Sequence, residues 1–270
     1  MLLRLLSKHA PFESTACGTV TVFKTSRCCG LSMSEIGRDQ VLPTLLNADY
    51  GRSRDEPEIA ANIATQLEHM GLSTWSISVL RRLRDAIGRQ EPDRVLEVGG
   101  SIGHRSAWLF DLFAERPVSR FDIIEQGAKF GVILHRLQTR YDAPSWSNII
   151  VNDFATLCAE EKAWKLTTAS GVGADERRLS EAYDAIIVDA PLSRLANDLQ
   201  HAMGLLSNNG VLYTTEPETP VGEYDELDDD GKAKVDGFNA WIKFVQESQP
   251  NYHMAFVPLF GGTIVAFFKR

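Results

Sequence analysis

The chain has 270 residues, a formal net charge of −8 and 44% hydrophobic residues. These proportions are those of a folded globular protein and exclude a disordered chain, a collagen-like repeat and a disulfide-rich scaffold. The negative charge argues against a nucleic-acid partner, because phosphate contacts need an excess of Lys and Arg on one face. No run approaches the roughly 18 consecutive apolar residues of a membrane span, so no membrane partner is expected.

Residues 1–32 differ from the rest of the chain in charge and in cysteine content. They hold four basic residues and one acidic residue, a net charge of +3, so the remainder carries −11. Cys17, Cys28 and Cys29 also lie here, without the spaced Cys or His partners of a metal site. Cys158 is the one cysteine of the remaining sequence, so we expect no disulfide framework and a reducing compartment.

Two interpretations of residues 1–32 place this segment outside the fold. In the first, Met33 is the true start, the preceding residues are an extension and the protein is cytoplasmic. In the second, the segment is an organellar transit peptide, because it is basic, contains Ser and Thr and is nearly free of acids. In both, residues 33–74 form an N-terminal helical cap and residues 75–270 form one domain.

From residue 75 onward, helical and strand patterns alternate. The first pattern predicts an amphipathic helix over residues 75–88, whose apolar face lies opposite Arg81, Arg82 and Arg84. Five apolar segments then predict buried strands, with helices between them, at residues 94–98, 121–125, 148–152, 183–189 and 211–215. Two apolar runs around Gly261-Gly262 predict a C-terminal hairpin.

Three segments carry more specific predictions. Residues 155–182 contain Gly171 and Gly173 and predict a short helix followed by a surface loop. Asn209-Gly210 predicts a turn that leads into the fifth strand. After a polar loop that runs to about residue 231, a final helix is predicted with one apolar face, formed by Val235, Phe238, Trp241, Ile242 and Val245.

This alternation predicts an α/β fold, a doubly wound, mostly parallel seven-stranded sheet with helices on both faces and a C-terminal β-hairpin. Such sheets bind ligands at the carboxyl ends of their strands, beside the topological switch point. Function is therefore expected in the residues that directly follow Val98, Ile124, Val151, Val188 and Thr215.

The first strand leads into a glycine-rich run, EVGGSIGH at residues 97–104. Glycine lets the backbone turn tightly and lets a ligand approach closely. The run is not the G-x-G-x-x-G of dinucleotide-binding proteins, because Ser101 and His104 interrupt it. Glu97 would repel a pyrophosphate but attract a ligand with sulfonium and ammonium groups. A plain strand–helix turn is the structural alternative.

Acidic residues also follow the next three strands. Glu125 can accept hydrogen bonds from both hydroxyls of a ribose. Asp153 and Phe154 would flank an adenine, and Asp189 follows the fourth strand. Each acid alone is commonly a solvated loop residue or a helix cap. Four acids at four successive strand ends instead suit a ligand with a ribose, an amine donor and a positive centre.

Three segments of the sequence resemble those of a known family. The run RVLEVGGSIGHRSAW resembles the first motif of class I S-adenosylmethionine (SAM)-dependent methyltransferases, above all the catechol and caffeoyl-CoA O-methyltransferase group, with Arg105 inserted before Ser106. YDAIIVDA resembles that group's fourth strand, and Gly237-Phe238-Asn239 with VPLFGGTIVAFFK resembles its last helix and hairpin. The resemblance covers roughly residues 70–270 and implies a Rossmann-like methyltransferase fold.

The resemblance implies SAM as the cofactor and assigns residues to each part of it. The methionine part would be held by Glu97, Gly99 and Gly103, in a loop that is also lined by Gly100, Ser101 and Ser106. Glu125, with Gln126 beside it, would bind the ribose, and Asp153 and Phe154 would contact the adenine. Asp189 would contact the cofactor near the reacting methyl group and serve as the catalytic residue. Further cofactor-lining positions would be Ser73, Thr74 and Trp75.

A metal site is implied for only part of that group, and this sequence departs from it. Metal-dependent members have an acid and a Lys after the Asp-Ala of the fourth strand, and Asp-Asn after the fifth. Here Pro191-Leu192-Ser193 follows Asp189-Ala190, and Thr215-Glu216-Pro217 replaces Asp-Asn. A hard divalent cation needs about six oxygens. Asp189 and Glu216 supply only two, so bound Mg²⁺ is not favoured, and the lysine base is missing as well.

Other polar residues are assigned by type alone. The acidic run EYDELDDD, residues 223–230, is interpreted as a solvated mobile loop, with a lid that disfavours anionic acceptors as the alternative. His104, His201 and His253 are candidate bases, and His104, next to the glycines, is expected to be structural or cofactor-lining. The aromatic residues at helical spacing are expected in the core, namely Trp108, Phe238 and Trp241.

The sequence therefore predicts a SAM-dependent methyltransferase that modifies a small-molecule acceptor, at oxygen and without a full divalent-metal site. The alternatives are a non-catalytic cofactor-binding relative and an aminopropyltransferase-like enzyme on the same fold. Because relatives are often dimers, a homodimer is an alternative to a monomer. The acceptor pocket is expected from the least patterned segments, residues 40–75, 155–182 and 216–232.

Overall fold

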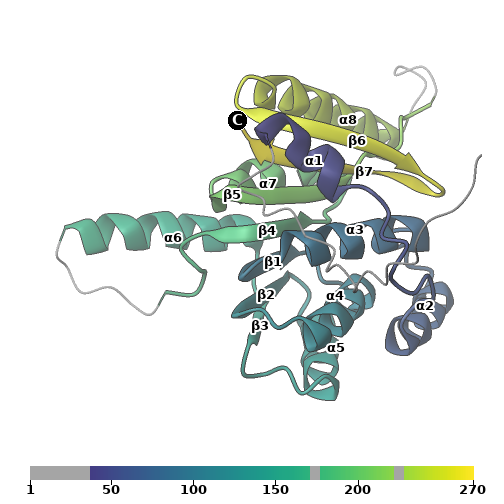
Figure 1. Cartoon of the computed structure of the whole chain (residues 1–270). Coiled ribbons are helices and arrows are strands. Elements are labelled where there is room, and N and C mark those ends of the chain that lie inside the picture. The colour runs from purple at the N-terminus through teal and green to yellow at the C-terminus, as the bar shows by residue number, and fades with distance from the viewer. Residues whose placement is uncertain (1–36, 171–176, 222–227) are drawn as a thin grey trace, which may run out of the picture. The chain divides into compact units, whose positions relative to one another are not determined.

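A computed structural model of the chain describes residues 37–170, 177–221 and 228–270 (Figure 1). The predictions for residues 1–32, for Gly171 and Gly173, and for most of the acidic run lie outside the described residues. Within the described part, a seven-stranded sheet has the order β3-β2-β1-β4-β5-β7-β6. No helix in these three ranges is long and apolar enough to cross a membrane.

The predicted sheet is confirmed, with five parallel strands and an antiparallel pair. The strands are β1 Arg94–Val98, β2 Arg120–Glu125, β3 Ser147–Val151, β4 Tyr183–Val188, β5 Leu206–Thr215, β6 Tyr252–Leu259 and β7 Gly262–Lys269. Strands β1 to β5 pair in parallel, whereas β7 runs antiparallel to both β5 and β6. The hairpin thus adds two strands beyond β5 at one side of a doubly wound sheet, as the two C-terminal apolar runs predict.

Helices precede the sheet and connect its strands. They are a short 3-10 helix η2 Arg38–Gln40, then α1 Val41–Leu45, α2 Glu58–Met70, α3 Ile77–Gln90, α4 His104–Glu115, α5 Ala128–Arg140, α6 Phe154–Ala169, α7 Leu192–Met203 and α8 Asp229–Ser248. Helices α1 and α2 fall in the segment predicted as an N-terminal helical cap. Helix α3 begins where Ser76 accepts a hydrogen bond from the backbone N–H of Val79, which satisfies one of its free donors.

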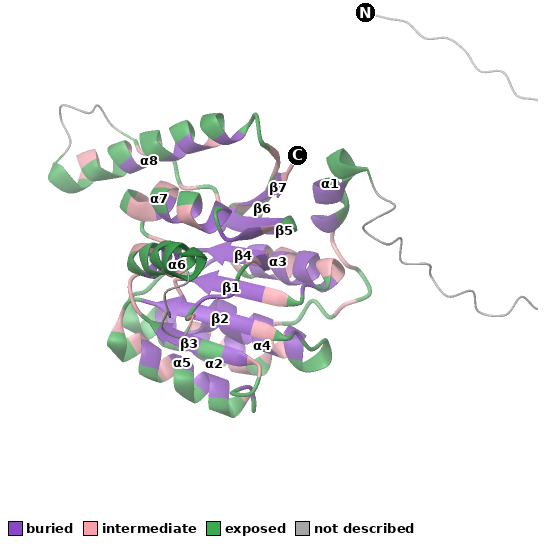
Figure 2. Cartoon of the chain, turned by 90° about the vertical axis from the view of Figure 1, so that its left-hand side faces the viewer, coloured by how far each residue is buried: buried purple, intermediate pink, exposed green. Residues whose placement is uncertain are grey.

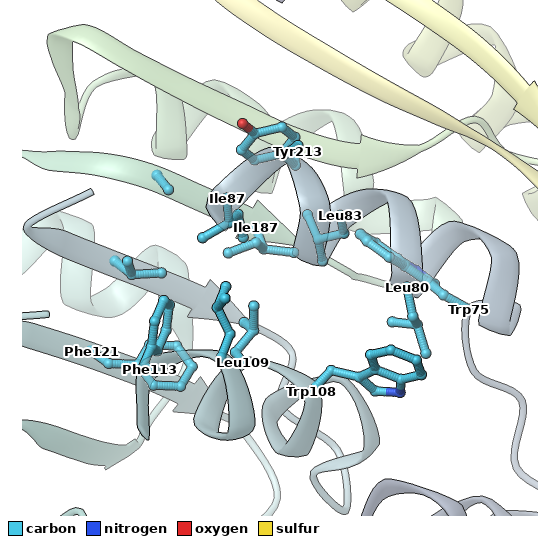
Figure 3. Packing of buried hydrophobic residues seen from close by; sticks show 14 of the residues in the cluster. Trp75, Leu80, Leu83, Ile87, Trp108, Leu109, Phe113, Phe121, Ile187 and Tyr213 are labelled. Carbon is cyan, nitrogen blue, oxygen red and sulfur yellow. The ribbon is translucent and has the colours of Figure 1, made fainter. Parts of the chain in front are cut away.

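Two hydrophobic cores lie on the two faces of the sheet (Figure 2). Successive side chains of a strand point to opposite faces. On β4, Ile187 therefore joins the core under α1 to α5, whereas Ile186 joins the core under α6 to α8. Figure 3 shows Leu80 and Leu83 of α3 pointing toward the side chains of α4 and of the strands. Trp108 and Trp241 are buried in the two cores, as their helical spacing predicts.

Three predicted elements differ in the structure. Helix α6 is sixteen residues long, not short, and its second half projects past the end of β4 (Figure 1). Asn209-Gly210 lies inside β5 and not in a turn before it. The pairing of β5 with β4 is irregular there, and Gly210 packs so closely on Tyr183 that a Cβ would lie 2.8 Å from its carbonyl oxygen. A glycine pair in a strand can thus mark a bulge as well as a turn.

Two side chains are on the wrong face in the sequence prediction. Arg84 is buried, because its guanidinium pairs with Asp85 and lies 5.5 Å from the ring centroid of Trp108. Ile242 is exposed, since α8 buries a stripe that runs through Trp241 and Phe244. Asp229 and Asp230, which the sequence places in the polar loop, form the first turn of α8. Negative charge is favourable at the N-terminus of a helix.

Candidate functional site at the carboxyl ends of β1 and β4

Strands β1 and β4 are neighbours at the topological switch point of the sheet. From β1 the chain builds outward to β2 and β3, and it then crosses back to add β4 on the other side of β1. Connections leave the two strands toward opposite faces at such a point, which opens a crevice beyond their carboxyl ends. The residues that follow β1 and β4, from Gly99 and from Asp189 onward, therefore define the candidate site.

The loop after β1 is held tightly by the protein itself. Gly99 has φ +85°, and a Cβ there would lie 1.9 Å from the carbonyl oxygen of Asp189. Gly103, at φ +91°, would bring a Cβ within 2.6 Å of Leu137, and one at Gly100 would meet Ile123 at 2.7 Å. Packing therefore requires glycine at position 99, whose backbone lies against Asp189 at the end of β4, and it disfavours a side chain at positions 100 and 103.

Arg105 lies at the centre of the site, in the first turn of α4. Its three guanidinium nitrogens face three partners. Nε lies 2.9 Å from Glu97 Oε1, Nη1 donates to Asp189 Oδ2 at 2.6 Å, and Nη2 donates to the carbonyl oxygen of Gly99 at 2.6 Å. One cation thus joins the acids of both strands. This residue, which the family resemblance marks as an insertion, connects two of the four predicted cofactor-binding acids.

These charged groups are buried to different degrees. The side chain of Glu97 is 0% exposed and that of Arg105 is 4% exposed, whereas that of Asp189 is 39% exposed. Burial raises the pKa of Glu97, although the nearby Arg105 charge opposes that rise. Trp75 covers the guanidinium, with Arg105 Cζ 4.7 Å from its ring centroid. Asp189 is therefore the acid of this trio that solvent and a ligand reach most readily.

Glu125, at the end of β2, is fixed by the backbone around it. Its Oε2 accepts the N–H of Ser101 at 2.7 Å, and its Oε1 accepts the N–H of Gly127 at 2.7 Å. The first bond stabilises Ser101 in an unusual backbone conformation, φ +51°. Since a carboxylate offers about four acceptor positions, both oxygens can still accept further hydrogen bonds.

A second arginine joins two of the predicted cofactor-binding residues, Gln126 and Asp153. Arg194 Nη1 donates to Gln126 Oε1 at 2.7 Å and lies 3.4 Å from Asp153 Oδ1. Asp153 also caps α6, since its side chain accepts the backbone N–H of Thr156. Phe154 is buried in the core beneath α6 and α7. Three predicted residues, Gln126, Asp153 and Phe154, therefore lie around the start of α6. Arg194, which contacts two of them, has no signal in the sequence.

His104 forms a separate polar cluster next to Arg105. Its Nε2 lies 2.7 Å from Glu56 Oε1, and its Nδ1 lies 3.1 Å from Thr74 Oγ1. The imidazole is buried, whereas Thr74 is exposed. The predicted cofactor-lining segment before α3 thus contacts the start of α4 twice, through Thr74 and through Trp75. No sequence pattern indicates Glu56, because its partner lies 48 positions away in the chain.

The two weak metal candidates, Asp189 and Glu216, belong to no larger cluster of possible metal ligands in the described part of the chain. No group of three or more His, Cys, Asp or Glu side chains with the arrangement of a metal site occurs there. Asp189 pairs with Arg105, and Glu216 is exposed at the end of β5, where its backbone N–H donates to Thr263. The guanidinium next to Asp189 repels a divalent cation.

Structural comparison finds many proteins with the same fold. The O-methyltransferase TomG from Streptomyces achromogenes, involved in tomaymycin synthesis and solved with SAM, has a TM-score of 0.59 and 16% identity over 80% of this chain and 92% of its own. An O-methyltransferase from Bacillus cereus solved with SAH, S-adenosylhomocysteine, gives 0.56 and 17% identity, over 86% and 96%. A caffeoyl-CoA O-methyltransferase-like protein from Staphylococcus aureus gives 0.58 and 15%, over 78% and 93%.

Sequence comparison adds no closer relative, since no family model and no curated protein matches this chain. The structural likeness at 15–17% identity concerns the arrangement of the whole sheet and its helices. The same conclusion about the fold follows from the sheet order of this chain, with its antiparallel C-terminal hairpin. The chain therefore has the Rossmann-like fold of class I SAM-dependent O-methyltransferases.

Proposed function

We propose that this chain is a SAM-dependent methyltransferase that modifies a small-molecule acceptor at oxygen. One observation carries the proposal. Acids from four strands lie along the carboxyl ends of the parallel strands. Glu97 and Asp189 are joined through Arg105 at the switch point, and Glu125 and Asp153 follow the next two strands, β2 and β3. This edge is where open α/β sheets bind nucleotides, and its carboxylates suit a ribose and an amine better than a polyphosphate.

The donor set fits the cofactor at both ends. Glu125 keeps acceptor positions for ribose hydroxyls, and its two backbone partners hold it in place. Asp153, which Arg194 joins to Gln126, would contact the adenine. Asp189, the exposed acid at the switch point, would lie near the methionine part. Glu97, Gly100, Ser101 and Ser106 would support that end of the site.

SAM supplies an electrophilic methyl group on a sulfonium. The chain's own residues would hold the acceptor oxygen in line with that methyl group and exclude water, which is the main contribution a protein makes to such a displacement. Asp189 would orient the acceptor hydroxyl and accept its proton. We propose no divalent cation in this step, because the Arg105 guanidinium already pairs with the carboxylate that would bind it.

Calorimetric titration of SAM tests the binding part of this proposal. We expect the wild-type chain to bind SAM, and Glu125→Gln to weaken binding at least about tenfold, because hydrogen bonds to charged groups are the strong ones. The matched control is Glu160→Gln, an exposed Glu that pairs with Arg178 at the surface of α6. No binding to the wild type, or equal binding to both variants, would overturn the assignment.

A second measurement separates catalysis from cofactor binding alone. A non-catalytic relative would bind SAM but transfer no methyl group to any compound. Incubation of the chain with labelled SAM and a library of phenols, alcohols and carboxylic acids, with and without chelator, distinguishes the two. We expect transfer to at least one oxygen acceptor, unchanged by chelator. Binding without transfer across the library would favour the non-catalytic alternative.

A further inference from the structure

Three side chains next to the candidate site form a chain of hydrogen bonds that the proposed methyl transfer does not use. Thr74 Oγ1 lies 3.1 Å from His104 Nδ1, and His104 Nε2 lies 2.7 Å from Glu56 Oε1. An ionised carboxylate only accepts hydrogen bonds, so Nε2 carries a proton. In the neutral imidazole Nδ1 is then the acceptor, and the Thr74 hydroxyl donates to it.

A hydroxyl, an imidazole and a carboxylate in this order are the groups that make an alcohol nucleophilic. The imidazole removes the proton as the oxygen attacks, and the carboxylate orients the imidazole and stabilises its charged form. The side chain of His104 is 4% exposed and that of Glu56 is 14% exposed, so water competes little for their hydrogen bond. Thr74 is exposed, so a reagent in solution can reach it.

The hydroxyl of Thr74 differs from those of other exposed threonines. Thr65, Thr139 and Thr167 lie in helices, and each donates to the carbonyl oxygen of the residue four positions earlier. Such a bond is common for Thr in a helix and gives the oxygen no base. Thr74 lies before α3 and contacts an imidazole that is 30 positions away in the chain.

The residues that follow Thr74 hold it in place. The Trp75 ring lies over the guanidinium of Arg105, with 4.7 Å from Arg105 Cζ to the ring centroid. Ser76 Oγ donates to the carbonyl oxygen of Phe260 at 2.8 Å, which ties the start of α3 to the C-terminal hairpin. A nucleophile is effective when its geometry is fixed before the substrate arrives.

The side chains around Thr74 favour an uncharged, apolar substrate. Leu72 and Ile77, which lie close to it in the chain, are exposed although apolar, and so is Phe260, whose carbonyl oxygen contacts Ser76. The carboxylate of Glu56 and the net charge of −8 disfavour an anion.

We propose that Thr74 is the nucleophile of a second activity, the hydrolysis of small uncharged esters, with His104 as the base and Glu56 as a positioning residue. Thr74 Oγ1 forms a bond to the carbonyl carbon, its proton passes to His104 Nδ1, and the ester C–O bond breaks as the alcohol leaves with that proton. Water then attacks the acyl group, the acid is released and the hydroxyl is restored. This activity does not depend on the proposed methyl transfer.

The test uses the full chain and p-nitrophenyl acetate, an uncharged activated ester. Release of p-nitrophenolate gives the rate, and mass spectrometry of the acid-quenched protein locates the acetyl group. We expect the wild type to react at least about tenfold faster than Thr74→Val, which keeps the shape of the side chain but removes its hydroxyl. Thr74→Ser keeps the hydroxyl and should retain the activity, and the acetyl group should lie on residue 74.

Two further variants test the base and its partner. His104→Gln should also lower the rate at least about tenfold. Glu56→Gln keeps an oxygen acceptor for the imidazole N–H but lacks the negative charge, so it should lower the rate and shift its pH profile to lower pH, because the imidazolium loses its carboxylate. The matched controls are Thr65→Val and His69→Gln, which change an exposed threonine and an exposed histidine of α2 and should leave the rate unchanged.

The outcomes decide the role of Thr74 separately from that of the nucleoside cofactor. A wild-type rate within about twofold of that of Thr74→Val, or acetyl groups on other residues alone, would overturn the inference. A rate that falls in Thr74→Val but not in His104→Gln would also overturn it, because the hydroxyl would then act without this base. Titration of SAM is a separate measurement, so its failure would overturn the proposed function and leave the esterase activity standing.

Discussion

The backbone of Gly99 and the carbonyl oxygen of Asp189 are in contact, and this contact leaves no room for a side chain at position 99. It joins the loop after β1 to the end of β4, where the backbone N–H of Asp189 also donates to Val98. Because both the positive φ and this contact require glycine, a substitution at position 99 is expected to lower the stability of the folded chain, whether or not the loop binds a ligand.

We therefore expect Gly99→Ala to lower the free energy of unfolding by about 3 kcal/mol or more, through backbone strain and the clash with Asp189. The control is Gly71→Ala, which has φ +65° but no atom within 4 Å of the added Cβ. It should cost only the left-handed conformation, about 1–2 kcal/mol. Urea unfolding of both variants measures the difference. Equal losses would show that the contact with Asp189 does not constrain position 99.

A second prediction concerns a buried hydrogen-bond network at the other end of the sheet. Tyr183 Oη donates to the fully buried Asp122 and accepts the backbone N–H of Ser180. Tyr183→Phe leaves a buried carboxylate and a buried N–H without this partner, so we expect a loss of about 1–3 kcal/mol. Tyr50→Phe, at an exposed ring, should change stability by less than about 0.5 kcal/mol. Thermal and urea unfolding provide both values.

The sequence predicts the fold of this chain well for a physical reason. Buried parallel strands are short apolar runs, and amphipathic helices repeat every 3.6 residues, so both leave local patterns. Such patterns locate β1 to β5 and the C-terminal hairpin. They fail at Asn209-Gly210, where a strand irregularity has the same residues as a turn, and at Arg84, where burial depends on Trp108 and Asp85.

The candidate site is less predictable, because its contacts join distant positions. Arg105 and Asp189 are 84 positions apart, and Arg194 and Gln126 are 68 apart. No periodicity records such a pair. One sequence signal does point to the first pair, since a basic residue in the first turn of α4 is unfavourable unless an acid lies close by. Arg105 therefore needs a partner, and the two strand-end acids are the nearest candidates.

A third prediction follows from the raised pKa of Glu97. Burial is the main cause of that rise, so the folded chain binds the proton more readily than the unfolded chain does. The stability contributed by Glu97 is therefore present at acid pH and is lost as the pH rises above 4.5, the ordinary pKa of this side chain. Relative to Glu97→Gln, the wild type should lose free energy of unfolding as the pH rises from acid toward neutral.

The measurement is urea unfolding of both proteins at several pH values between the ordinary glutamate pKa of 4.5 and neutrality. Glu160→Gln serves as the control, because its exposed side chain should give a difference from wild type that does not vary with pH. If the wild type gains stability over Glu97→Gln as the pH rises, the ion pair with Arg105 outweighs burial, and the predicted direction of the pKa shift is wrong.

The last prediction concerns divalent cations at Asp189. Arg105 Nη1 lies 2.6 Å from Asp189 Oδ2, so a cation that bound this carboxylate would meet a fixed positive charge at close range. A hard cation also needs several oxygen ligands, and the described residues contain no group of three or more His, Cys, Asp or Glu side chains that could hold one. We therefore expect millimolar Mg²⁺ to leave the unfolding temperature of the chain unchanged, since a ligand stabilises a protein only when it binds the folded state.

Asp189→Asn should show the same response to Mg²⁺ as the wild type, because position 189 would bind no cation in either protein. A rise in the unfolding temperature with Mg²⁺ that disappears in Asp189→Asn would demonstrate a metal site at this strand end, and the metal-free mechanism would then be wrong.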